Sequence, residues 1–144
     1  MSEAIPYISL LLIVFGWFVA NHQANRREER KEARALVDES RKRIAEITTA
    51  SLSYEMEGKA ELTTTIKSSL DLLEVDLRRM PHMQFKGSPL LRALVDFQDA
   101  VTGGDFESAD HPKRTFVSPE VQAILRTRNA LIAELERQFA VFFK

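Results

Sequence analysis

Hydrophobic and polar residues separate sharply at the start of this chain. No charged residue occurs from Ile5 to Ala20, whereas charged residues dominate from Arg26 onward. An apolar circumference without a polar face predicts a membrane helix rather than a buried helix in so small a protein. At 1.5 Å per residue the stretch reaches about 24 Å, less than the roughly 30 Å of a hydrocarbon core. A short anchor is therefore predicted, which includes flanking residues or thins the bilayer locally.

The residues around this stretch argue against a cleaved export signal. A secretory signal has a basic segment before its apolar run and a small-x-small cleavage site after it, whereas Met1, Ser2 and Glu3 precede this one. We therefore interpret residues 1–25 as a transmembrane anchor, with aromatic rings near both ends at headgroup level. The residues expected to anchor the chain in the membrane include Ile5, Tyr7, Leu11, Phe15, Trp17 and Val19.

A basic cluster after the anchor predicts its orientation. No Lys or Arg precedes the apolar stretch, and five follow it, namely Arg26, Arg27, Arg30, Lys31 and Arg34. The positive-inside rule then places the N-terminus outside and the C-terminal part in the cytoplasm, at the inner membrane if the source is bacterial. We interpret the cluster mainly as a stop-transfer signal and a solvated helix face. Recognition of anionic lipid is the alternative.

The polar part of the chain has helical periodicity. No Gly or Pro occurs between Arg26 and Glu57, so the first helix is expected to continue straight out of the bilayer. Alternating spacings of four and three predict a narrow seam that other helices of the same chain cover. Its members are Ala33, Val37, Ser40, Ile44, Ile47, Ser51 and Tyr54.

Three further helices follow from apolar stripes and end signals. One stripe precedes Pro81, and the next two helices start with Ser-Pro pairs at Ser88 and Ser118. The predicted stripes are Leu62, Ile66, Leu70, Leu73 and Leu77 in the second helix, and Val121, Leu125, Leu131, Leu135, Phe139 and Phe142 in the last. No alternating strand pattern occurs, so the fold class is all-α, with a cytoplasmic bundle of about four helices over residues 26–144. The connections 81–87 and 103–117 are predicted loops, and the longer one is either mobile or a contact site.

Composition removes several kinds of chemistry. A net charge of -1 argues against general nucleic-acid binding, and the absence of cysteine removes disulfides, thiolate metal sites and cysteine nucleophiles. His22, His82 and His111 lack the spacing that places two metal ligands on one helix face. No serine lies in a nucleophile elbow, and no lysine lies in a glycine-rich phosphate loop. We therefore predict no enzyme activity, no cofactor and no metal.

One motif resembles a known family. The segment "RNALIA" from Arg128 to Ala133 resembles the R-N-x-x-x-H motif of HEPN domains, which are small helical bundles and often ribonucleases that dimerise across that motif. Arg128 and Asn129 match, whereas Ala133 replaces the histidine. The resemblance implies a non-catalytic HEPN-like bundle with an interface at Arg128 and Asn129. The layout is also similar to the membrane accessory protein of type VI-B CRISPR systems, which implies an oligomeric membrane assembly in antiviral defence.

Two functions are compatible with these patterns. The first is a membrane-tethered, non-enzymatic interaction module that contacts lipid, self-associates and docks a cytoplasmic protein. Docking would use the 103–117 loop or the aromatic C-terminal end with Phe139 and Phe142. The alternative is an oligomeric membrane effector or pore-forming protein acting in antiviral (phage) defence. Neither function predicts a specific nucleic acid as partner.

Overall fold

The computed structural model describes residues 4–80 and 88–143, with side chains from Leu10 onward. It contains the helices α1 (Ala4–Glu57), α2 (Leu62–Arg79), α3 (Pro89–Thr102) and α4 (Pro119–Phe142). The described residues include no strand. The predicted all-α fold is confirmed, and so are the four expected helices. The predicted loop at 81–87, with His82, lies outside the described residues.

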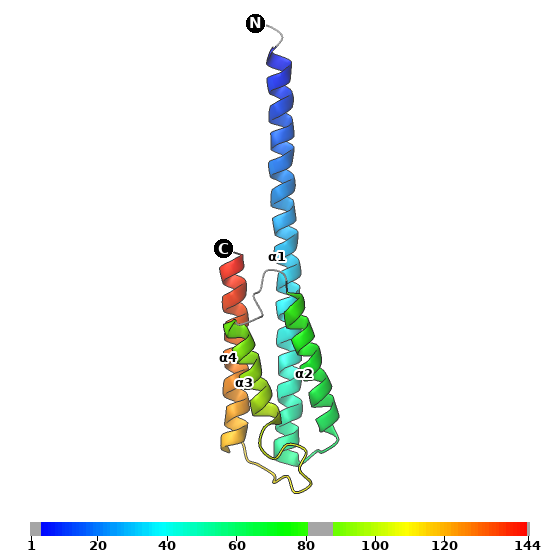
Figure 1. Ribbon diagram of the computed structural model, residues 1–144, viewed down its shortest axis with the longest axis vertical. Helices are drawn as coiled ribbons and strands as arrows, with labels where there is room; N and C mark the ends of the chain where they lie inside the picture. The colour runs from blue at the N-terminus through cyan, green and yellow to red at the C-terminus, as the bar shows by residue number, and fades with distance from the viewer. Residues whose placement is uncertain (1–3, 81–87, 144) are drawn as a thin grey trace.

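Helix α1 is much longer than the others. Its 54 residues correspond to about 80 Å of continuous helix. Figure 1 shows that its N-terminal part stands alone, while its C-terminal part lies among α2, α3 and α4. Among the side chains of α1 that the structure describes, from Leu10 onward, the first buried one is Ala33. The helix ends at Glu57. Gly58 follows it with a φ of +71°, which strongly favours glycine, and its N–H donates to the Tyr54 carbonyl at 3.0 Å.

The seam of α1 is buried as predicted. Helix α1 packs against α2 and α4 along it, and α3 packs against α4. The two serines make the seam narrow enough for close packing, and the Ser51 hydroxyl is satisfied by the Ile47 carbonyl at 2.8 Å. Every predicted seam position is buried, namely Ala33, Val37, Ser40, Ile44, Ile47, Ser51 and Tyr54.

The apolar stripes of the shorter helices complete the core. In α2, four of the five predicted positions are buried and Leu62 is half-buried. In α4, the prediction that Leu125 belongs to the buried stripe is wrong, because Ile124 is buried and Leu125 is only half-buried. Seven residues separate Ile124 from Leu131, which is two helical turns, whereas six separate Leu125 from Leu131. Phe142 is also wrong as a core residue, since it is 40% exposed at the end of α4.

The predicted helix boundaries at the Ser-Pro pairs are correct. Ser88 caps α3, because its hydroxyl accepts a hydrogen bond from the Leu91 N–H at 3.3 Å. Ser118 occupies the N-cap position of α4, but its hydroxyl donates to the Thr115 carbonyl at 2.7 Å and does not cap the helix. After α3, a Cβ at Gly103 would lie 2.4 Å from the Asp99 carbonyl oxygen, so this C-cap requires glycine.

Residues 4–25 of the predicted anchor are helical within α1, and residues 1–3 lie outside the described residues. Within the described part of the chain, no helix is both long enough and apolar enough to cross a membrane. The fold therefore supports the helical bundle and not the finer prediction of a transmembrane span. Helix α1 runs without a break through position 25, where the two predicted domains would meet.

Candidate functional site

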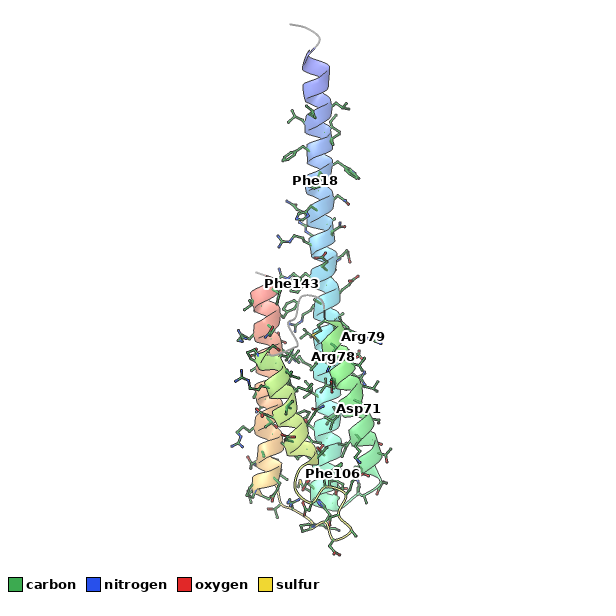
Figure 2. All side chains as sticks on the ribbon, viewed as in Figure 1. Phe18, Asp71, Arg78, Arg79, Phe106 and Phe143 are labelled. Atoms are coloured by element: carbon green, nitrogen blue, oxygen red, sulfur yellow. The ribbon has the colours of Figure 1, made fainter. Side chains whose placement is uncertain are left out.

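The projecting part of α1 carries a solvent-exposed apolar surface. Figure 2 shows side chains around the helix in this region, with Phe18 far from the bundle. Nine large apolar residues are exposed by 38–68%, namely Leu10, Leu11, Leu12, Ile13, Val14, Phe15, Trp17, Phe18 and Val19. Soluble monomers rarely expose apolar surface of this extent, and large exposed apolar patches are typical of interaction sites. The side chains of Ile5 and Tyr7 lie outside the described residues.

The five basic residues lie on one side of α1. At 100° per residue, Arg26, Arg27, Arg30, Lys31 and Arg34 fall within an arc of about 140°. The acidic residues of the same segment, Glu28, Glu29 and Glu32, fall outside that arc. The basic arc is turned toward α4, because both Arg34 and Arg41 contact Glu136 of that helix, at 2.8 and 2.9 Å.

The aromatic end of α4 lies beside this basic arc. Figure 1 shows that the C-terminal end of α4 lies beside α1 and is directed toward its N-terminal part, and Figure 2 shows Phe143 there. A groove of about 420 Å³ is lined by Arg27, Arg30, Lys31, Arg34 and Phe139. Smaller recesses beside it are lined by Arg26, Phe142 and Phe143, among others, and Glu29 also lines one of them. We call the groove and these recesses the basic–aromatic groove.

Charges in the basic–aromatic groove divide into paired and unpaired groups. Arg34 forms ion pairs with Glu136 and Asp38, and its guanidinium lies 5.4 Å from the Phe139 ring centre. The hydrogen bond with Glu136 raises the pKa of Arg34. Lys31 pairs with Glu28 at 3.0 Å. Among the described residues, no carboxylate pairs with Arg26, Arg27 or Arg30. The groove is therefore open and positively charged, which favours an anionic ligand.

A second cluster lies at the opposite end of the bundle. There the 103–117 loop packs against the C-terminal end of α1 through Arg114. Its Nη1 donates to Glu55 Oε2 at 2.7 Å, its Nη2 donates to Asp105 Oδ1 at 2.9 Å, and its backbone N–H donates to the Glu55 carbonyl at 2.7 Å. The Nε also lies 3.2 Å from Glu120 of α4. We call this arrangement the loop clamp.

The loop clamp shifts the pKa values of Arg114 and Asp105. Burial alone would lower the pKa of Arg114, but hydrogen bonds with Glu55 and Asp105 outweigh it, and the pKa is raised. The hydrogen bond from Arg114 lowers the pKa of Asp105. Ion pairing therefore favours the charged forms of Arg114 and Asp105, and the polar atoms of the cluster are used in holding the loop.

His111 is enclosed by the loop clamp. Its side chain is 7% exposed and its ring stacks on Tyr54 with 4.3 Å between the ring centres. Its Nε2 lies 3.4 Å from Glu55 Oε2, and its Nδ1 lies 3.7 Å from Asp105 Oδ1, yet neither nitrogen has a hydrogen-bond partner. Because Arg114 already binds both carboxylates, the cluster orders the loop and offers no free acid–base pair. The part of the chain that the structure describes contains no group of residues arranged to hold a metal ion.

The predicted interface at Arg128 and Asn129 lies on the outer side of α4. Arg128 donates to the Asn129 side-chain oxygen through Nε at 3.0 Å and Nη2 at 2.8 Å. Ala133 and Asn129 are exposed, and Arg128 is half-buried. Phe139 belongs to the core and contacts Phe143 with 5.0 Å between ring centres. The structure thus brings Phe139 to the basic cluster but leaves Arg128 and Asn129 apart from both.

The loop clamp and the role of Phe143 were missed by the sequence analysis. Glu55 and Arg114 are far apart in the chain and belong to no periodic pattern, so no local signal links them. The aromatic end of α4 was recognised, but its position beside the basic arc depends on tertiary packing. Comparison of the chain with protein-family models, curated proteins and solved structures finds no match.

Proposed function

We propose that this protein is a membrane-tethered, non-enzymatic helical module that docks a cytoplasmic partner. The observation that supports this most is the continuity of α1, which joins an exposed apolar segment to a packed bundle without a break. A continuous helix fixes the distance between the bilayer and the bundle. The protein would therefore present its bundle at a defined height above the membrane.

The exposed apolar segment supports the tether. Each large apolar side chain gains about 1.5–3 kcal/mol on full burial, so nine of them gain on the order of 10 kcal/mol or more on leaving water. The apolar sequence begins at Ile5, ahead of the first described side chain at Leu10. Five basic residues on the C-terminal flank, against none on the other, favour a cytoplasmic bundle.

The ordered loop supports docking of a partner protein. The loop clamp holds 103–117 against α1, and beside it Phe116 and Val117 are exposed by 54% and 81%. Two apolar side chains presented on an ordered segment can enter a partner pocket at little entropic cost. This surface lies at the end of the bundle farthest from the apolar segment, where a cytoplasmic protein has access (Figure 1).

Both the tethered module and the oligomeric effector self-associate, and the number of copies distinguishes them. A short anchor gains by clustering, because neighbouring helices share the cost of a locally thinned bilayer. The mass of the detergent-solubilised particle measures the number of copies in the assembly. A small oligomer agrees with the tethered module, a closed ring of many copies would favour the pore-forming effector in antiviral defence, and a monomer would contradict self-association in both.

Membrane fractionation tests the tether directly. Leu12→Asp places a charge in the apolar segment, where it costs about 2.5–3.5 kcal/mol of insertion free energy. We expect the variant to leave the carbonate-washed membrane fraction in larger amount than the wild type. Val117→Asp is the matched control, because it makes the same kind of change at an exposed position of the loop. Equal membrane retention of Leu12→Asp and Val117→Asp would refute the tether.

A further inference from the structure

We propose that the basic–aromatic groove binds the phosphate headgroup of an anionic phospholipid. This inference rests on the proposed tether, because it requires the groove to face the membrane. It adds a defined lipid site to a helix that would otherwise only cross the bilayer. The ligand chemistry is a singly charged phosphodiester held by guanidinium groups and flanked by acyl chains.

The height of the groove fits a headgroup. Arg26 lies about 9 Å, and Arg30 about 15 Å, beyond Ala20 along the helix axis. The headgroup layer extends some 5–8 Å beyond the hydrocarbon core on each side. Side chains on a helix lean toward its N-terminus, which is the membrane side here, so long arginine side chains reach back into that layer.

The charges of the groove fit a phosphate. Arg27 and Arg30 line the groove without a carboxylate partner among the described residues, whereas Arg34 is already neutralised by Glu136 and Asp38. The guanidinium fork matches phosphate oxygens with two parallel hydrogen bonds. Basic residues that only oriented the anchor would not need to converge on one side of α1, toward α4.

The aromatic residues of the groove fit a lipid rather than a free anion. Phe139 forms the wall of the groove opposite the arginines, and Phe142 and Phe143 continue it beside Arg26. Phe142 and Val141 are exposed by 40% and 57% at the end of α4, which is directed along α1 toward the apolar segment. A free phosphate gains nothing from this apolar rim, whereas the glycerol and upper acyl carbons of a lipid do.

The test uses the full chain in nanodiscs that contain phosphatidylcholine and phosphatidylglycerol. Native mass spectrometry measures the ratio of the two lipids that stay bound to the protein after it is released from the nanodisc. We expect the wild type to be enriched in phosphatidylglycerol. The enrichment should be about 25-fold lower in the Arg27→Gln/Arg30→Gln variant, because each of the two arginines near an anionic surface contributes about fivefold. Arg92→Gln/Arg126→Gln removes the same charge at exposed positions of α3 and α4 and should keep the enrichment.

The outcomes separate this inference from the tether. Equal lipid ratios for wild type and Arg27→Gln/Arg30→Gln in assembled nanodiscs would overturn the lipid site and leave the tether intact. A loss of the same size in the control pair would also overturn it, since general charge would then explain the enrichment. Displacement of phosphatidylglycerol by inorganic phosphate at matched ionic strength would make free phosphate the ligand and refute the lipid assignment. A chain that does not enter nanodiscs would refute both proposals.

Discussion

Replacing Arg114 with methionine tests whether the loop clamp holds the far end of the bundle together. The substitution keeps most of the side-chain volume and removes the guanidinium that contacts Glu55, Asp105 and Glu120. Asp105 and Glu120 are exposed by 33% and 46%, so water can replace their partner. Glu55 is only 7% exposed and would remain as a buried carboxylate beside His111.

The size of the effect follows from that one buried charge. Removing one member of a buried ion pair costs about 3–5 kcal/mol, whereas an exposed pair contributes about 1 kcal/mol or less. We expect Arg114→Met to lower the free energy of unfolding by about 3 kcal/mol, because the guanidinium is 14% exposed and only Glu55 is left without solvent. The measurement is urea unfolding in detergent, followed by circular dichroism at the helical band.

Two further variants make the result specific. Lys113→Met removes the same charge from the neighbouring exposed position and should change stability by less than about 0.5 kcal/mol. Adding Glu55→Gln to Arg114→Met removes the buried carboxylate and should restore part of the lost stability. Two results would contradict this explanation. One is that Arg114→Met lowers the free energy of unfolding no more than Lys113→Met does. The other is that the double variant loses the full sum of the losses that Arg114→Met and Glu55→Gln cause singly.

The remaining predictions concern the core, the predicted interface and acid stability. Leu135→Asp should lower the free energy of unfolding by more than about 3 kcal/mol, because Leu135 is fully buried, whereas the exposed control Ala133→Asp should leave helicity unchanged; equal urea midpoints would contradict the assigned faces of α4. Arg128→Lys should lower the particle mass without loss of helicity, since lysine cannot reproduce the planar contact with Asn129; an unchanged mass would remove Arg128 from the interface. Because the folded-state pKa of Asp105 is lowered, its contribution to stability is present above about pH 4 and is lost as the pH falls through the lowered value. Thermal unfolding of Asp105→Asn should therefore depend less on pH below about pH 4 than that of the wild type, and parallel curves would show that the Arg114 contact contributes no pH-dependent stability.

Local patterns predicted the helices well because each pattern is repeated many times. The α1 seam from Ala33 to Tyr54 has seven members in a helical repeat, and all seven are buried. Ser88 and Pro89 predicted the start of α3 through two independent signals, a cap and a fixed φ. The error at Leu125 arose where two adjacent apolar residues, Ile124 and Leu125, allowed two stripes.

Contacts that depend on tertiary packing could not be predicted from local sequence patterns. The loop clamp joins Glu55 to Arg114, which are separated in the sequence by α2 and α3, and neither residue belongs to an amphipathic repeat. The sequence therefore predicted only that 103–117 is a long loop, either mobile or a contact site. The basic cluster was recognised for its orientation signal, but only the position of Phe139 beside Arg34 indicates a groove.

The orientation of the bundle relative to a membrane is the central claim, and a pair of reporters tests it most directly. A fluorescent protein that folds only in the cytoplasm and a phosphatase active only outside it are each fused after Lys144 and expressed in a bacterial host. Both fusions are followed in the carbonate-washed membrane fraction. We expect fluorescence and no phosphatase activity in that fraction, because five basic residues follow the apolar segment and none precedes it. Phosphatase activity there, or recovery of both fusions in the wash, would contradict the claim.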